Sequence, residues 1–206
     1  MTGPDVHRAL LAVFTLHNAE EVALARAAPP VDPRVLQRLG LPADAHRPDR
    51  FALAAGALTA ASGAVLAAAR RGGPSATGRQ AAVAALTGAL GGNAAAHLGR
   101  AALTRRYNAG SGTAPALLAA SATVLAGTVR GGDLTARRAV VCAALGALAV
   151  VPVTAAALTL AVRVLPPGAP APGPLPATAP GGGHGGAVRP PRGPSPHRIG
   201  ESLSAR

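Results

Sequence analysis

Aromatic residues are scarce in this 206-residue chain, and lysine is missing altogether. The chain contains no tryptophan, one tyrosine and two phenylalanines, and every one of its basic side chains is an arginine. A water-soluble core of this composition would depend on alanine, leucine and valine, and alanine buries little apolar area. In lipid the requirement is the opposite, because small side chains let helix backbones approach closely. The composition therefore favours a membrane-embedded helical bundle over the alternative, a soluble alanine-rich bundle.

The single cysteine, Cys142, excludes an internal disulfide framework. The formal charge of +12 raises the question of nucleic-acid binding. The arginines, however, stand in pairs between apolar stretches, as at 70–71, 105–106 and 137–138, and no aromatic side chains accompany them as stacking platforms. We therefore expect no nucleic-acid partner, and we interpret these arginines as the flanks of membrane-spanning helices.

Long apolar stretches bounded by arginine, glycine or proline dominate the first 165 residues. A membrane-spanning helix requires about 20 mostly apolar residues. Four stretches meet or approach that length: Phe51 to Ala69, Gln80 to Thr104, Thr113 to Val129 and Ala139 to Val162. A fifth candidate, Ala9 to Ala28, is interrupted by polar residues. Two glutamates in this segment argue against the alternative of a cleaved signal peptide, whose apolar core is uninterrupted.

We therefore predict an all-α, integral membrane helical bundle of about five transmembrane helices over residues 1–165. This predicts a multi-pass protein of the cell membrane with the lipid bilayer as its partner. Residues 166–206 are rich in proline and glycine, and they offer too little apolar surface to offset the entropy of ordering. We predict a disordered tail there. Within the bundle, residues 31–40 predict a short interfacial or connecting helix, with Pro33 at its first position and Gly40 just past its end.

Polar side chains are concentrated at one place in the first helix. His17, Glu20 and Glu21 share one arc, because an α-helix advances about 100° per residue. Ionisable groups within transmembrane helices almost always face the interior of the bundle. Asn93 and His97 are four residues apart in the third predicted span, so they also share one face. The first and third spans run in parallel in a five-span bundle, which predicts that the two polar groups meet in one layer.

Imidazole and carboxylate groups on neighbouring helices are suitable ligands for zinc or iron. We therefore predict a metal site formed by five residues: His17, Glu20, Glu21, Asn93 and His97. Glu20 is also the candidate general base of a metal-dependent reaction. Two alternatives stay open, namely a proton-coupled small transporter in which the glutamates titrate, and a non-catalytic interaction subunit in which the polar cluster fixes helix register. Whether the protein is an enzyme is therefore also open.

The segment His17-Asn18-Ala19-Glu20-Glu21 resembles the signature of the HXXEE family, small multi-pass bacterial membrane proteins of uncharacterised function. A second region also resembles family members. It comprises Asn93 with His97, then Arg106-Tyr107-Asn108-Ala109-Gly110, and Thr113. The resemblance covers roughly the segment from residue 10 to residue 115. It implies a membrane location and the importance of the histidine and both glutamates of the signature, but no particular reaction.

One position departs from the family pattern. Family members commonly have proline where this chain has Ala109, so the turn here lacks that source of rigidity. Gly110 still permits the positive φ that a tight turn requires. The adjacent Arg106 and Tyr107 lie where the third span is expected to leave the bilayer, and we predict that they are interface anchors.

Overall fold

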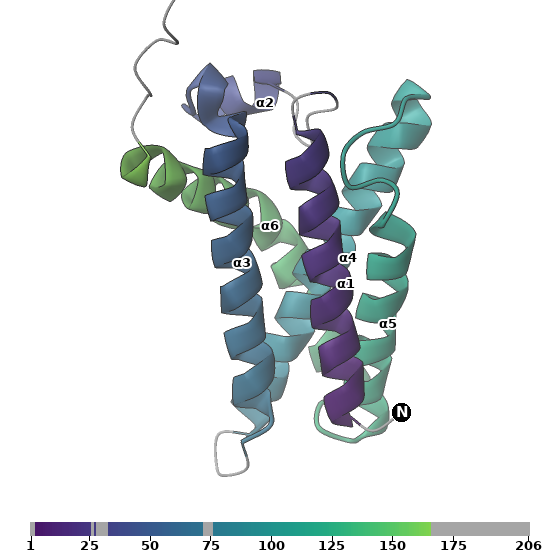
Figure 1. Ribbon diagram of the computed structural model, residues 1–206. Coiled ribbons are helices and arrows are strands. Elements are labelled where there is room, and N and C mark those ends of the chain that lie inside the picture. Colours follow the sequence, from purple (N-terminus) through teal and green to yellow (C-terminus); the bar gives the residue numbers. More distant parts are fainter. Residues whose placement is uncertain (1–2, 26, 28–32, 72–75, 166–206) are drawn as a thin grey trace, which may run out of the picture. The chain divides into compact units, whose positions relative to one another are not determined.

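The structure, a computed structural model, describes residues 3–25, 27, 33–71 and 76–165 (Figure 1). Within these ranges every regular element is a helix, as predicted. The elements are α1 (Gly3–Leu24), α2 (Pro33–Arg38), the 3-10 helix η1 (Ala43–His46), α3 (Pro48–Ala69), α4 (Ala76–Thr104), α5 (Ala114–Arg130) and α6 (Ala136–Val164). The predicted tail, residues 166–206, lies outside the described residues.

The five long helices predicted from the apolar stretches are present as α1, α3, α4, α5 and α6. The largest difference between the predicted and the observed boundaries is at α1. The helix begins at Gly3 and ends at Leu24, whereas the predicted segment ran from Ala9 to Ala28. Its early start follows from Pro4 and Asp5, because proline fits a first helical turn and an acidic side chain there complements the helix dipole. The short helix predicted at 31–40 is α2, and Gly40 beyond its end has the expected positive φ of 70°.

Among the described helices, α3 and α6 are long and apolar enough to cross a membrane, with mean hydropathies of 1.8 and 2.3 over their most apolar windows. Helix α5 is apolar but has only 17 residues. The polar residues of α1 and α4 lower the hydropathy of those two helices. Length and composition alone do not distinguish a membrane span from the core helix of a soluble protein. The structure thus establishes an all-α fold with two span-length apolar helices, and five spans stay a prediction.

The packing of the helices positions α1 and α4 for a shared site. Helix α1 packs against α3 and α5, and α4 packs against α3, α5 and α6. Figure 1 shows that α1 and α4 run in the same direction, whereas α6 crosses the other long helices obliquely. Four helices share one apolar core, to which α1 contributes Leu10 and Phe14, α3 contributes Leu66, α4 contributes Val83 and α5 contributes Leu117. Because this core joins α1 to α4 and α5, it fixes the level at which their polar side chains meet.

Glycines allow a very close crossing of α4 and α6. A Cβ atom at Gly88 of α4 would overlap the backbone of Ala143, and a Cβ atom at Gly146 of α6 would overlap the backbone of Ala85. Gly92 lies one turn further along α4, and a Cβ atom there would be only 3.0 Å from the Cβ of Ala147. The glycine-rich stretch of α4 is therefore a helix-contact surface, as its small side chains predict.

Gly88→Ala is expected to destabilise the fold, because the added methyl group must push α4 and α6 apart. Overpacking of this kind costs about 1 to 3 kcal/mol. Gly78→Ala on the same helix is the matched control, since a Cβ atom there meets no other atom within 4 Å. It should raise stability slightly through helix propensity. Thermal unfolding of the purified protein, followed by circular dichroism, measures both effects. Equal midpoints for the two variants would contradict the close crossing.

Candidate metal centre

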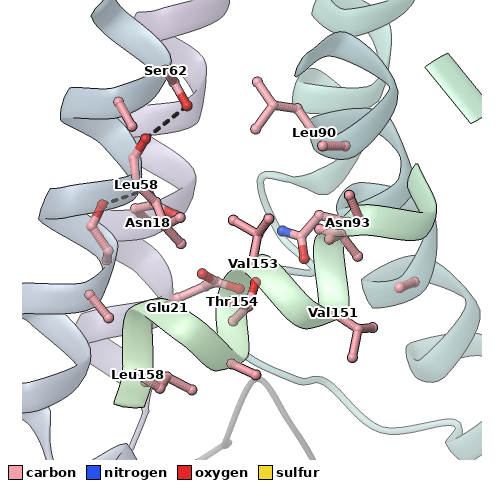
Figure 2. A pocket seen from close by; sticks show the side chains of 18 of the residues that line it. Asn18, Glu21, Leu58, Ser62, Leu90, Asn93, Val151, Val153, Thr154 and Leu158 are labelled. Carbon is pink, nitrogen blue, oxygen red and sulfur yellow. Dashed lines mark hydrogen bonds between the residues drawn. The ribbon is translucent and has the colours of Figure 1, made fainter. Parts of the chain in front are cut away.

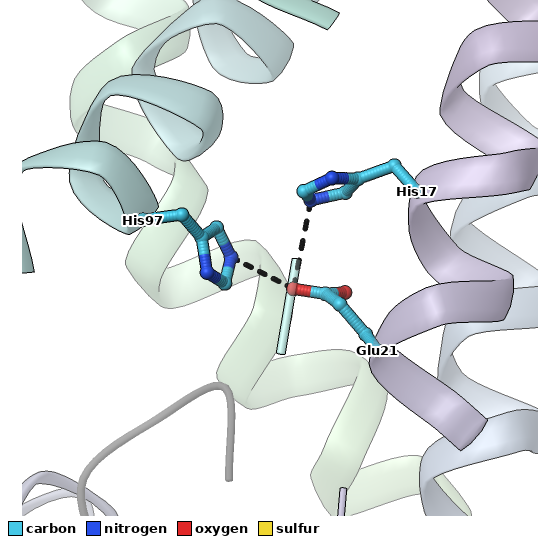
Figure 3. Close-up of side chains that lie close together, drawn as sticks. All are labelled: His17, Glu21 and His97. Atoms are coloured by element: carbon cyan, nitrogen blue, oxygen red, sulfur yellow. Dashed lines mark ion pairs between the residues drawn. The ribbon is translucent and has the colours of Figure 1, made fainter. Parts of the chain in front are cut away.

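Three side chains with metal-ligand chemistry converge between α1 and α4. His17 and Glu21 come from successive turns of α1, and His97 comes from α4 (Figure 3). Glu21 Oε1 lies 2.8 Å from His97 Nε2 and 3.6 Å from His17 Nε2. The two imidazole rings meet edge to face, with centroids 5.1 Å apart. All three residues are buried, and one ligand atom from each lies within 4.8 Å of the others. The predicted buried polar cluster between the first and third long helices is therefore present.

The orientation of His17 is set by Thr113, at the start of α5. His17 Nδ1 lies 2.9 Å from Thr113 Oγ1, and the Thr113 hydroxyl donates its own proton to Glu20 Oε2 at 2.6 Å. Because that proton is committed to a carboxylate, Thr113 Oγ1 accepts from His17, and Nδ1 of His17 carries hydrogen. The lone pair of the neutral ring is then on Nε2. Asn93 Nδ2 lies 3.1 Å from this atom, in position to donate to it.

The orientation of His97 is set in the same way by Asn108. His97 Nδ1 lies 2.8 Å from Asn108 Oδ1, while Asn108 Nδ2 donates to the backbone carbonyl of His97 at 3.2 Å. The second bond fixes which end of the amide faces the ring, so Asn108 Oδ1 accepts from Nδ1–H of His97. In this ring, too, the lone pair is left on Nε2. That atom is the one in contact with Glu21.

These hydrogen bonds leave Nε2 of His97 and Oε1 of Glu21 facing each other as acceptors, with Nε2 of His17 3.6 Å from the same oxygen. A neutral His97 and an ionised Glu21 would place two lone pairs 2.8 Å apart, without a hydrogen atom between Nε2 and Oε1. Such a contact is favourable only when a positive species lies between the two atoms, either a proton or a metal ion. The arrangement therefore provides a buried binding site for a cation.

Glu20 immediately precedes Glu21 on α1, but its side chain faces a different part of the molecule, the α4–α5 turn. Its two carboxylate oxygens accept hydrogen bonds from the backbone N–H groups of Gly110, Gly112 and Thr113 at 3.0, 3.1 and 2.8 Å. They also accept from the hydroxyl groups of Thr113 and Tyr107. Glu20 thus anchors the α4–α5 turn to α1 through five donors. It was predicted as a ligand or general base, and the structure places its oxygens in this turn and outside the triad.

The turn itself fits between the two imidazoles. Gly110 has φ of 93°, in the left-handed region that favours glycine. A Cβ atom at this position would lie 2.9 Å from Cε1 of His17 and 2.9 Å from Cε1 of His97. Two separate reasons therefore require glycine at position 110: the positive φ of its backbone and the lack of space for a Cβ atom beside the two rings. The alanine at 109, where family members commonly have proline, is fully buried and leaves this conformation intact.

Gly110→Ala is expected to cost backbone strain and to displace both imidazoles. Gly132→Ala is the matched control, because Gly132 also has a positive φ, 75°, but has open space around it. Strain alone should lower the free energy of unfolding by about 1 to 2 kcal/mol in both variants. Only Gly110→Ala should also weaken metal binding, which calorimetric titration with zinc measures. Unchanged affinity in Gly110→Ala would show that the rings are not held by this turn.

The chain also matches a family model over the residues that form this site. The model is described as a protein of unknown function with HXXEE motif, and it matches residues 9–125, more than half of the chain. The chain belongs to the HXXEE family. No curated protein and no solved structure matches it. In this HXXEE protein the motif histidine and the second glutamate belong to the buried cluster with His97, and the first glutamate accepts hydrogen bonds from the turn that carries Thr113.

The remaining predicted residues have separate positions in this HXXEE protein. Asn93 contacts His17, as described above. Tyr107 donates its phenol hydrogen to Glu20, and this bond raises the pKa of the Tyr107 phenol. Arg106 is exposed, and its predicted role as an interface anchor, like that of Tyr107, stays a prediction. Asn108 and Thr113 were not assigned roles from the sequence, although a Thr and an Asn on either side of a turn glycine are typical hydrogen-bonding residues of such turns.

Tyr107 reports directly on the Glu20 anchor, because it is the single tyrosine and there is no tryptophan. The raised pKa means that the protonated phenol is favoured while Glu20 accepts its hydrogen bond. Glu20→Ala is therefore expected to lower the pKa of Tyr107 towards its ordinary value of about 10. Titration of phenolate absorbance measures this change. Glu21→Gln, which leaves the turn untouched, should show the wild-type curve, and a shift of equal size there would contradict the assignment.

A cavity of about 630 Å³ adjoins the HXXEE site (Figure 2). Residues of α1, α3, α4 and α6 form most of its wall, which is largely apolar. Glu21, Asn93 and His97 line it on the side of the triad. Asn18, which also lines it, is held by a hydrogen bond of 2.7 Å from its Nδ2 to Thr59 Oγ1. A molecule within this cavity would therefore contact the cation site directly.

Proposed function

We propose that this HXXEE protein is an integral membrane protein that binds zinc or iron through His17, Glu21 and His97. The observation that carries the proposal is the pair of oriented imidazoles. Both Nδ1 atoms donate to oxygen atoms, so the lone pair of each neutral ring is on Nε2, which lies 2.8 Å (His97) and 3.6 Å (His17) from Glu21 Oε1. Metal-binding histidines generally donate their other N–H to an oxygen in this way, which fixes the tautomer and the ring orientation.

The number of ligands suits metal-dependent chemistry. Catalytic zinc sites use three protein ligands and keep a fourth position for water or substrate. Glu21 and His97 line the cavity, so a metal held by the triad would be accessible to a molecule in the cavity. A bound metal would supply Lewis-acid activation at this place. A metal held by Nε2 of His17 would use the lone pair that Asn93 Nδ2 now faces, and the Asn93 amide would then be available as a further ligand or as a hydrogen-bond partner of the substrate.

We assign Glu20 a positioning role instead of the catalytic role considered from the sequence. All five of its hydrogen bonds come from the α4–α5 turn, so its carboxylate oxygens face the turn and not the triad. Through Thr113 it holds Nδ1 of His17. A carboxylate that acts on a metal ligand through an intervening group is a common second layer of metal sites.

The location in a membrane, with α1, α3, α4, α5 and α6 as spans, is part of the same proposal. It is supported by α6, of whose most apolar window only 11% is buried, whereas the core helix of a soluble protein is mostly buried. Large apolar side chains are exposed along this helix, among them Leu145, Leu148 and Leu160. Sedimentation with membranes and resistance to alkaline extraction are expected. Release of the protein in soluble, folded form would contradict this part of the proposal.

Elemental analysis of detergent-purified full-length protein tests the metal site. About one equivalent of zinc or iron is expected for the wild type, and little in His97→Ala. His7→Ala is the matched control, since His7 lies on α1 away from the triad and should keep the metal. Circular dichroism establishes that each variant is folded. A folded wild-type protein that takes up neither metal, even after incubation with zinc or ferrous iron, would refute the proposal.

One observation favours a second candidate, a proton-coupled transporter. The 2.8 Å contact between His97 and Glu21 is also satisfied by a single shared proton. In that case proton flux in liposomes should depend on pH and be abolished in Glu21→Gln, and the wild type should bind no metal. The elemental analysis therefore separates the two candidates.

A further inference from the structure

We propose that the cavity beside the triad binds a single-chain anionic lipid, with its charged headgroup at the metal and its acyl chain along α4. This inference rests on the proposed metal site and names the class of substrate or ligand that the site receives. It follows from three features of the cavity: its length, the position of its polar groups and the charge of those groups.

The cavity wall is long enough for one acyl chain. It includes residues of α4 from Ala82 to Arg100, a length of about 27 Å at the helical rise. This exceeds the thickness of one leaflet of hydrocarbon, about 15 Å or half of the bilayer core, so an extended acyl chain fits along the wall together with its headgroup. The volume of about 630 Å³ is also within the usual range for sites that enclose small molecules. Small residues such as Ala89 on α4 and Ala61 on α3 leave this space open.

The ionisable groups of the cavity wall, Glu21, His97 and Arg100, lie towards one part of it. On α4, Asn93, His97 and Arg100 share one helix face at spacings of four and three residues. Ser62 of α3 also lines the cavity, and its hydroxyl donates to the carbonyl of Leu58. Glu21 of α1 contacts His97 and lies across from Asn93 in the view of the cavity (Figure 2). The N-terminal part of the α4 wall, from Ala82 to Leu90, is apolar. A polar region with a long apolar extension matches an amphiphile, whereas a uniformly polar metabolite would leave most of the wall without suitable contacts.

The charge in this region favours an anionic headgroup. Arg100 lines the cavity one turn beyond His97, and a bound divalent metal would add further positive charge. Carboxylate and phosphate oxygens bind metals such as zinc and iron, and guanidinium groups form charge-assisted hydrogen bonds with both. The chemistry that the site recognises is thus an anionic oxygen headgroup on one alkyl chain. A fatty acid and a monoacyl phosphate both have it.

Binding of three probes with the same chain tests the inference on metal-loaded, full-length protein in detergent. The probes are palmitate, monopalmitoyl phosphatidic acid and hexadecanol. At least one anionic probe is expected to bind at least about 10-fold more tightly than hexadecanol, because the alcohol lacks the charge-assisted bonds. The tighter of the two anionic probes identifies the headgroup. Equal affinity for all three, or no binding of either anion, would overturn the inference.

Two cavity-filling variants and one control locate the bound chain. Ala89→Phe and Ala61→Phe place a ring in the cavity from opposite walls, and each should weaken binding of the anionic probe about 10-fold, the loss expected when two methylene groups are excluded. Ala102→Phe on α4, outside the cavity wall, should bind as the wild type does. Wild-type affinity in both folded cavity variants would overturn the inference.

Metal content measured on the same samples distinguishes this inference from the proposed function. All three variants should keep the wild-type metal stoichiometry, because none of them alters the triad. A wild-type protein that holds metal but no anionic probe would overturn the lipid inference alone. A wild-type protein without metal would refute the proposed function, and unchanged lipid binding after removal of metal would refute the headgroup position.

Discussion

Glu21→Gln is expected to lower the affinity for zinc by at least about 100-fold, since substitutions in the second layer of metal sites already cost 10- to 100-fold. The helices should stay folded. The glutamine amide has the same size as the carboxylate, and its N–H can donate to Nε2 of His97, which supplies the hydrogen that the native contact lacks. The variant therefore removes the metal ligand and its charge without removing the contact between α1 and α4.

Competition with a chromogenic zinc chelator measures this loss, and circular dichroism establishes that the fold is kept. His7→Ala, on the same helix, should show wild-type affinity. A Glu21→Gln protein that binds zinc as tightly as the wild type would show that the three converging atoms do not act as ligands.

Glu20→Ala is expected to cause a large loss of stability, unlike Glu21→Gln. It removes the acceptor of five hydrogen bonds, three of them from the backbone N–H groups of Gly110, Gly112 and Thr113. Bonds to charged groups contribute about 1.5 to 3 kcal/mol each, so a combined loss of at least about 3 kcal/mol follows even when most of these bonds are replaced by water. The thermal midpoint of the purified protein should fall accordingly.

Glu20→Gln provides the graded comparison. Its amide keeps one acceptor but places N–H groups against the donors of Thr113, so it should retain only part of the lost stability. Glu21→Gln should unfold near the wild-type midpoint. Because Glu20 also orients Thr113, both Glu20 variants should bind zinc more weakly even when folded. A Glu20→Ala protein as stable as the wild type would contradict the role of Glu20 as the anchor of the turn.

Helical periodicity predicted that His17, Glu21 and His97 come together, although the predicted set also contained Glu20, which lies outside the triad. The i, i+4 relations of His17 with Glu21 and of Asn93 with His97 are local properties of a helix, and they hold wherever the helix is placed. The expectation that α1 and α4 run in parallel at matching depth followed from counting the long apolar stretches. The structure shows the resulting buried cluster of two histidines and one glutamate.

The separate roles of the two glutamates could not be predicted from the sequence. Glu20 and Glu21 differ in direction by about 100° on α1, and periodicity does not say which neighbour each one meets. That depends on the α4–α5 turn, whose path through Gly110 brings Thr113 back to α1. Hydropathy identifies α3 and α6 as candidate membrane spans but not α1 and α4, because the polar residues of the site make those two helices less apolar.

The long sequence separation between Glu20 and its partners has a consequence for biosynthesis. The Thr113 groups that satisfy Glu20 are encoded 93 residues later. At synthesis rates of 5 to 20 residues per second, the first helix is synthesised roughly 5 to 20 s before the turn whose groups donate hydrogen bonds to Glu20. In the proposed topology, the nascent α1 must therefore wait at the insertion machinery, or enter the bilayer with its acids protonated, until α4 and α5 arrive. Ribosome-stalled chains ending before residue 93 should hold this helix only loosely in the membrane, and chains that extend past α5 should hold it firmly.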